Sequence, residues 1–251
     1  MRAFTQIVTG MVLALTLVAC NKTTSAVTDD DMSLGNAQAK VTVIEYGSAS
    51  CAHCARWNND VFAAFKARFI DTGRVHYVFR EFLTEPRAMA AAGFLTARCA
   101  GRDKYFQVLD AVYHAQEEMF TTQDMRGPLL RIAQGVGLTE AQFNACVSDQ
   151  AATKALNDRV EKYARDANIT ATPTFVINGK VNAGEMSMEQ LEAAISAAEI
   201  AAGVTPPPAP AAAAPAAPTA GAPAATPAAA PAAATPPAAP AAPAPAAPAA
   251  K

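Results

Sequence analysis

The sequence predicts an α/β domain with a central β-sheet covered by helices. An apolar run that ends at Tyr46 leads into two cysteines, Cys51 and Cys54, and then into a long helical pattern. A block of nearly continuous helical pattern follows, after which the chain returns to a short strand, an Asn-Gly turn and a closing helix. Strands and helices that alternate in this order pack as a sheet with helices on its faces.

The two ends of the chain differ in composition from its middle. The chain has 251 residues and a formal net charge of −2, so we expect no attraction to nucleic acid or to an anionic membrane surface. An apolar leader and a tail made almost only of Ala and Pro leave about 165 residues of ordinary composition, which is enough for one domain. We expect a signal peptide at 1–19, a polar tether at 20–33, one domain at 34–201 and a disordered tail at 202–251.

The leader ends at a cysteine. Arg2 precedes an apolar stretch, residues 7–18, that is too short for an ordinary transmembrane helix and is typical of a secretory signal. Its end, Leu17-Val18-Ala19-Cys20, resembles the lipobox of bacterial lipoproteins. The resemblance implies cleavage before Cys20, lipidation of that residue with acyl chains such as palmitate, and a lipid anchor in the periplasm. The alternative is a plain signal peptide that is cut after Ala19 and leaves Cys20 free.

The residue after the anchor bears on the choice of membrane. In the lipoprotein pattern an aspartate there would mark retention at the inner membrane, and this chain has Asn21. We therefore expect the outer membrane over the inner one. The stretch 21–33 is polar and includes Asp29-Asp30-Asp31, which predicts a solvated tether, because a calcium loop needs glycine spacing that is absent here.

The first expected strand, residues 41–46, contains one carboxylate. The run is otherwise mostly apolar, as in a central strand that is buried on both faces. A carboxylate inside such a strand is costly unless it is paired or protonated. Glu45 is therefore either an acid that handles protons beneath the cysteines or a strand-end residue that reaches solvent.

The pattern Cys51-Ala52-His53-Cys54 opens a helix that we expect to run from about 54 to 70. The first cysteine lies at the helix N-terminus, where free N–H groups and partial positive charge stabilise an anion. A thiolate there has a lowered pKa and is the reactive form of cysteine. The spacing also lets the two sulfurs form a disulfide, so we expect thiol–disulfide exchange through a mixed disulfide.

The later elements follow from their patterns. Residues 75–82 are rich in β-forming residues and predict a second strand. Residues 83–168 predict a helical insertion. A strand at 175–177, the turn Asn178-Gly179 and a closing helix at about 189–201 complete the domain. Pro173 begins the last strand, where a missing N–H is tolerated.

Two further cysteines, Cys99 and Cys146, fall in the helical insertion. An even remainder in an exported protein suggests a structural disulfide, and two separate buried thiols are the alternative. The histidines His76 and His114 have no partner in the pattern and are interpreted as structural. A zinc ribbon would need a second close cysteine pair, and a c-type haem would need histidine in the place of Ala55, so we expect no metal and no cofactor.

The order of these motifs resembles the thioredoxin fold of the DsbA-like thiol–disulfide oxidoreductases. The matching stretches are Leu34-Gly35-Asn36, Lys40-Val41-Thr42-Val43-Ile44-Glu45-Tyr46, Cys51-Ala52-His53-Cys54, Phe79-Arg80-Glu81-Phe82, Thr172-Pro173-Thr174-Phe175 and Asn178-Gly179. The resemblance implies a mixed sheet with flanking helices and a helical insertion. It also implies that thiol-containing exported proteins are the substrates and that a membrane redox partner resets the cysteine pair.

The resemblance also implies residue roles. Cys51 would be the exposed nucleophile, Cys54 the buried resolving thiol, and His53 a stabiliser of the Cys51 thiolate by charge or hydrogen bond. Glu45 matches the family's buried acid. Pro173 would be its cis proline, packed against the disulfide, and the backbone beside Thr172 would pair with an extended substrate peptide.

The direction of the exchange stays open at this point. The family's oxidases commonly have proline in the place of Ala52, and Thr172 resembles the equivalent residue of isomerase and reductase relatives. We expect donation of a disulfide to exported proteins. The alternatives are a reductase or isomerase of the same fold, and a lipoprotein that binds peptides or metal without turnover.

Overall fold

The computed structural model describes residues 26–208. The predicted signal peptide, the lipidation site at Cys20 and residues 209–251 of the predicted tail lie outside this range. Within it, five strands form one mixed sheet in the order β1-β3-β2-β4-β5. The strands are β1 (Met32–Gly35), β2 (Val41–Gly47), β3 (Val75–Glu81), β4 (Thr174–Ile177) and β5 (Lys180–Ala183).

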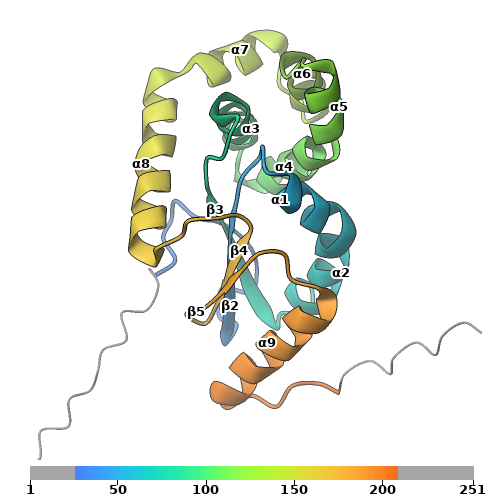
Figure 1. Cartoon of the computed structure of the whole chain (residues 1–251), viewed down its shortest axis with the longest axis vertical. Helices are drawn as coiled ribbons and strands as arrows, with labels where there is room; N and C mark the ends of the chain where they lie inside the picture. The colour runs from blue at the N-terminus through green and yellow to red at the C-terminus, as the bar shows by residue number, and fades with distance from the viewer. Residues whose placement is uncertain (1–25, 209–251) are drawn as a thin grey trace, which may run out of the picture. The chain divides into compact units, whose positions relative to one another are not determined.

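The two central strands are parallel and the outer pairs are antiparallel. β2 runs parallel to β3, whereas β1 pairs with β3, and β4 pairs with both β2 and β5, in antiparallel register. The helix that joins β2 to β3 supplies the crossover that a parallel pair requires. The fold class expected from the sequence, a mixed sheet with flanking helices and a helical insertion, is confirmed (Figure 1).

That crossover helix is continuous from Ala52 to Ile70. It consists of α1 (Ala52–Trp57), η1 (Asn58–Phe62), α2 (Ala63–Phe65) and η2 (Lys66–Ile70), where η1 and η2 are π-helical turns. The residues that join these pieces keep right-handed helical backbone angles, so they form one helix with two wider turns. Its buried aromatic side chains pack towards the sheet, as Trp57 does against Phe175 at 4.7 Å between ring centroids.

The helical insertion lies between β3 and β4. It contains α3 (Arg87–Cys99), the short η3 (Arg102–Lys104), α4 (Tyr105–His114), α5 (Gln116–Thr122), α6 (Arg126–Gly135), α7 (Glu140–Ser148) and α8 (Gln150–Ala167). The final helix is α9 (Met188–Ala201). Among the described helices, none is long and apolar enough to cross a membrane.

Alternation along β2 divides the core between the two faces of the sheet. Val43 belongs to the large cluster with the crossover helix and α9, whereas Ile44 and Tyr46 belong to a smaller cluster with Tyr163 of α8. Successive side chains of a strand point to opposite faces, so Glu45 shares the face of Val43. Glu45 therefore faces the side of the sheet that carries the cysteine helix.

The sequence expectation of a solvated tether through residue 33 is wrong at its C-terminal end. Asp31 is buried, and Met32 and Ser33 already belong to β1. The carboxylate of Asp31 accepts two hydrogen bonds from the fully buried guanidinium of Arg80, each 2.9 Å long. A buried arginine needs a paired anion, so Asp31 is held inside the domain instead of in water.

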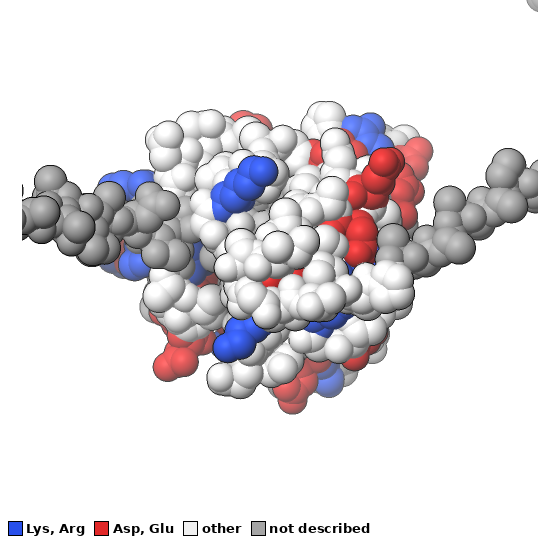
Figure 2. Space-filling model, turned by 90° about the horizontal axis from the view of Figure 1, so that it is seen from below, with Lys and Arg blue, Asp and Glu red and all other residues white. Residues whose placement is uncertain are grey.

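Charged side chains are unevenly spread on the face shown in Figure 2. Most of that face is uncharged, a group of Asp and Glu side chains lies on its right, and the Lys and Arg side chains are scattered. A protein that binds nucleic acid through such a face would show a continuous basic stripe. This face has none.

Candidate active site

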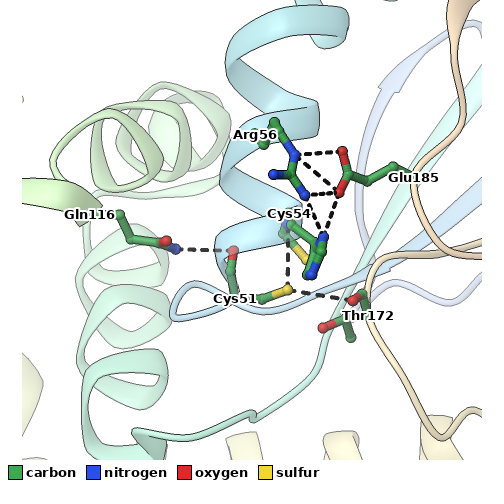
Figure 3. A network of polar contacts seen from close by, with 7 residues as sticks. Cys51, Cys54, Arg56, Gln116, Thr172 and Glu185 are labelled. Carbon is green, nitrogen blue, oxygen red and sulfur yellow. Dashed lines mark hydrogen bonds and ion pairs between the residues drawn. The ribbon is translucent and has the colours of Figure 1, made fainter. Parts of the chain in front are cut away.

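The sulfur of Cys51 caps the N-terminus of α1. The backbone N–H of Cys54 donates to the Cys51 sulfur at 3.4 Å, and the Cys51 thiol lies 3.4 Å from the carbonyl oxygen of Thr172 (Figure 3). Cys51 retains 9% of its surface exposed, whereas Cys54 is fully buried. A partner in solution can therefore reach the first sulfur and not the second.

The surroundings of the two thiols separate their pKa values. A hydrogen bond from the Cys54 thiol, aided by Thr172 and by the backbone N–H groups of Cys54 and His53, outweighs burial and lowers the pKa of Cys51 to about 5. Burial, together with the nearby Cys51 and Glu45, raises the pKa of Cys54 well above its ordinary value. At neutral pH the pair therefore holds one negative charge, on the sulfur of Cys51.

Glu45 lies beneath the pair and is almost completely buried. The hydroxyl of Tyr77 donates to its carboxylate at 2.7 Å. Burial raises the pKa of Glu45 to about 8, and the negative charge of Cys51 adds to the effect of burial. A negative charge on Glu45 would in turn add to the raised pKa of Cys54, after the larger effects of burial and Cys51. Of the two interpretations of Glu45, the strand-end residue that reaches solvent is wrong, because only 1% of its surface is exposed.

His53 lies between the cysteines, but its imidazole contacts residues other than Cys51. Its Nδ1 lies 2.6 Å from a carboxylate oxygen of Glu185 and 2.6 Å from the guanidinium of Arg56. The backbone N–H of His53 is the part that helps to lower the pKa of Cys51. The expected charge or hydrogen bond from the ring to the thiolate is thus not the arrangement found here.

The Thr172–Pro173 peptide faces the first cysteine across the site. The peptide bond between them is cis, and the Thr172 carbonyl is the one that contacts the Cys51 thiol. The Pro173 carbonyl accepts from the N–H of Gly184 at 2.9 Å, which ties the loop to the end of the β4–β5 hairpin. Thr172 therefore borders the reactive sulfur.

The loop before α1 is fixed by two contacts that the sequence pattern did not reveal. The buried side chain of Gln116 donates to the carbonyl of Ala49 at 2.9 Å and to that of Cys51 at 3.3 Å (Figure 3). The hydroxyl of Ser50 donates to the carbonyl of Thr84 at 3.0 Å. Gln116 comes from the helical insertion, so the insertion holds the cysteine loop in place.

The remaining pair of cysteines joins two helices of the insertion. Cys99 at the end of α3 and Cys146 in α7 form a disulfide with their Cα atoms 6.2 Å apart. Nearby, the buried carboxylate of Glu81 at the end of β3 accepts from Arg98 of α3 and from Arg159 of α8. The insertion is thus tied to itself by a covalent bond and to the sheet by ion pairs.

Residues outside this site take other places. His76 is buried in β3, and His114 lies exposed on α4 with its ring near the carbonyl of Asp110. In residues 26–208 no group of three or more His, Cys, Asp or Glu side chains is arranged to hold a metal ion. No sequence motif identifies Glu185, Arg56 or Gln116. Glu185 and Gln116 lie far along the chain from the residues that they contact, and Arg56 is a common residue that belongs to no motif.

Comparison with known proteins identifies the family. A family model described as "Thioredoxin" matches residues 27–197. A Rickettsia bellii protein named "Putative protein-disulfide oxidoreductase" is 32% identical over 178 residues, which cover 70% of this chain and 68% of that protein. A relative from Rickettsia conorii, with the same name and the designation RC0029, is also 32% identical, and the match covers 63% of its length. The chain therefore spans about two thirds of the length of these relatives.

Solved structures agree with this assignment. The crystal structure of Wolbachia pipientis alpha-DsbA1 superposes with a TM-score of 0.65 at 25% identity, over 70% of this chain and 94% of that one. BdbD from Bacillus subtilis has the same fold, with a TM-score of 0.52 at 22% identity over 67% of this chain and 92% of that one. A CxxC pair at a helix N-terminus, a cis proline opposite it and these relatives lead to one conclusion. The chain belongs to the DsbA-like thiol–disulfide oxidoreductases of the thioredoxin fold.

Proposed function

We propose that this protein donates a disulfide to the thiols of exported proteins through the Cys51–Cys54 pair. The observation that carries the proposal is the sulfur of Cys51, which is held at a helix N-terminus with a pKa lowered to about 5. A stable thiolate stabilises the reduced pair, and this makes the disulfide form a stronger oxidant.

The exchange runs in two steps. A thiolate of the substrate attacks the Cys51 sulfur, a mixed disulfide forms, and the Cys51–Cys54 bond breaks with its electron pair on Cys54. The second substrate thiolate then attacks the substrate sulfur of the mixed disulfide, and Cys51 leaves as a thiolate. The substrate loses two electrons and two protons. The cysteine pair gains both electrons and one proton, on Cys54, and the second proton goes to solvent because Cys51 stays a thiolate.

Cys54 leaves in a buried place, so its negative charge has to be neutralised. The raised pKa of Cys54 means that it takes up a proton as it leaves. Glu45, with a pKa of about 8, is protonated at neutral pH, and it faces the side of the sheet that carries the cysteine helix. Glu45 is therefore the proposed proton donor in this direction and the proton acceptor when the pair is oxidised again.

The substrate is an extended peptide that lies beside Thr172. The Thr172 carbonyl borders the reactive sulfur, and main-chain pairing there would bring a cysteine of any sequence to Cys51. Main-chain recognition suits an enzyme with many substrates, because it does not depend on the side chains of the substrate. A membrane redox partner would then remove the two electrons from the pair.

The proposed place of action is the periplasm, on a lipid anchor at Cys20 and with the outer membrane favoured. The support is the signal-like leader and the sequence Leu17-Val18-Ala19-Cys20. Radioactive palmitate should label the wild-type protein in cells and not C20A, and C20A should leave the membrane fraction. Equal labelling of the two proteins would contradict the anchor.

The activity is tested with a reduced peptide that contains two cysteines. Stoichiometric oxidised protein should convert the peptide to its disulfide, and C51S should not. Exchange that persists in C51S would refute the site. The reduction potential of the pair separates the donor role from that of a reductase: a value as negative as that of thioredoxin, about −270 mV, would contradict donation.

A further inference from the structure

A single carboxylate beside the active site holds two basic side chains of the cysteine helix. Glu185 lies in the loop between β5 and α9. Its oxygens accept from Nε of Arg56 at 3.0 Å and from a terminal nitrogen of the same guanidinium at 2.6 Å. One of these oxygens also lies 2.6 Å from Nδ1 of His53. The loop after the sheet is thereby tied to the first turn of the cysteine helix.

The contacts at Nδ1 of His53 compete with one another. That nitrogen lies 2.6 Å from Glu185 and 2.6 Å from Arg56. This nitrogen can donate a hydrogen bond to the carboxylate or accept a hydrogen bond from the guanidinium, but a single ring nitrogen cannot do both at once. With Glu185 ionised, the form of His53 that carries a proton on Nδ1 is favoured, and the ring is held towards the carboxylate.

Glu185 remains ionised across the working range of pH. The hydrogen bonds from Arg56, with a smaller contribution from His53, lower the pKa of Glu185 to about 2. Glu185 raises the pKa of the Arg56 guanidinium most, and the negative charges of Asp60 and then of Cys51 make smaller contributions in the same direction. The two basic side chains are thus bound to one permanent anion, and the guanidinium of Arg56 also interacts electrostatically with the reactive sulfur.

We propose that Glu185 is a positioning residue of the redox centre, which binds His53 and Arg56 and so limits how strongly these two side chains stabilise the Cys51 sulfur anion. This inference rests on the proposed function and adds a control on its oxidising strength. Both basic side chains are well exposed, at 66% for His53 and 57% for Arg56. Without the carboxylate they are free to turn towards the sulfur.

The other titratable groups around Cys51 carry no positive charge that could stabilise its thiolate. They are Cys54 on α1, Glu45 on β2 with Tyr77 on β3, and Tyr113 on α4, whose pKa is raised by burial and by Cys54 and Glu45. All of these are buried and acidic or neutral. The basic groups described in contact with the cysteine turn are His53 and Arg56, and both are bound to Glu185.

The test is the substitution Glu185→Gln, which keeps the size and an oxygen acceptor but removes the charge. The pKa of Cys51, followed by the thiolate absorbance of the reduced protein, should fall by about half a unit, which is about a threefold change in the ionisation constant. The equilibrium constant for oxidation of glutathione by the pair should rise about threefold as well. No shift, or a rise in the pKa of Cys51, would overturn the proposal.

A second background separates positioning from the direct effect of the carboxylate. In H53A/R56A there is nothing left to position, so adding E185Q should shift the pKa of Cys51 by less than a third of the shift seen in the wild type. An equal shift in both backgrounds would mean that the charge of Glu185 acts on the sulfur directly, and the positioning role would fall.

The matched control is Glu140→Gln. Glu140 on α7 forms an exposed ion pair with Arg126 on α6 at 2.6 Å, and neither side chain contacts Cys51 or Cys54. E140Q should leave the pKa of Cys51 and the glutathione equilibrium unchanged. A shift as large as that of E185Q would mean that the loss of any negative charge on the domain has this effect, and the inference would be overturned. A wild-type pair that does not exchange with glutathione would instead refute the proposed function itself.

Discussion

The buried carboxyl of Glu45 should make the stability of the domain depend on pH. Its pKa is about 8 in the folded protein, against 4.5 for an exposed glutamate. The folded state therefore binds more protons than the unfolded state between these values, so the free energy of unfolding falls as pH rises through this window. One proton corresponds to a loss of about 1.4 kcal/mol per pH unit, or about 4 kcal/mol between pH 5 and pH 8 as an upper limit.

Cys51 changes the free energy of unfolding with pH in the opposite direction, so its thiol has to be replaced before the effect of Glu45 can be measured. Its pKa is lowered to about 5 in the folded protein, so the reduced folded state binds fewer protons than the unfolded state above pH 5. Stability from this group increases with pH and offsets the loss from Glu45. The reduced wild type should therefore vary little between pH 5 and pH 8.

The C51S background isolates Glu45. The free energy of unfolding of C51S, measured with urea at pH 5, 6, 7 and 8, should fall as pH rises. The fall should be at most about 4 kcal/mol, because without the negative charge of Cys51 the pKa of Glu45 is raised less. C51S/E45Q should lack this fall, because glutamine does not titrate and still accepts from Tyr77. Other titrating groups are common to both proteins. A C51S profile that is flat, or that rises with pH, would refute the argument about burial.

The other predictions concern the contacts that hold the domain together. Asp31→Asn removes the negative charge that pairs with the buried Arg80 and should lower the free energy of unfolding by about 3–5 kcal/mol. The same change at the exposed neighbour Asp30 should alter it by less than about 0.5 kcal/mol. Equal effects of the two would contradict the ion pair. Gln116→Leu leaves the carbonyl of Ala49 without its donor and should cost about 1–3 kcal/mol in urea unfolding; an unchanged midpoint would contradict the contact. C99S/C146S opens a loop with a sequence separation of 47 and should lower the free energy of unfolding by about 4 kcal/mol. The variant is compared with the reduced and the oxidised wild type, and a stability equal to that of the oxidised wild type would contradict the bridge.

The chemistry of the site was predictable because it is local in sequence. The sulfur of Cys51 and the N–H group that it accepts from are three residues apart, so a strand, a CxxC pair and a helix pattern define the arrangement. Glu45 stood out because it interrupts an apolar strand, but that pattern left two interpretations open, and the family resemblance favoured the buried acid. An α/β domain with a central sheet followed from the same patterns, and the family resemblance implied that the sheet is mixed.

The residues that hold the site were not predictable in the same way. Glu185 is 132 residues from His53, and Gln116 is 65 residues from Cys51, and nothing in the sequence near either one indicates its partner. Asp31 had a usable signal. A strand that is expected to be buried and contains Arg80 requires an anion, and the acidic run that ends at Asp31 offered one.

The short edge strand β1 was also missed. It has four residues, ends in glycine and is partly exposed, so it shows neither the length nor the apolar character that predict a strand. Its pairing with β3 is decided by tertiary contacts instead of local preference. The prediction of a solvated tether extended into this strand for the same reason.

The rate at which iodoacetamide alkylates Cys51, measured from pH 3 to pH 10 in the reduced protein, tests the central claim most directly. Alkylation requires the thiolate, so the rate follows the ionisation of this sulfur. The account predicts a midpoint near pH 5. A midpoint near that of an ordinary thiol, about 8.5, would contradict the stabilised sulfur anion on which the proposed activity depends.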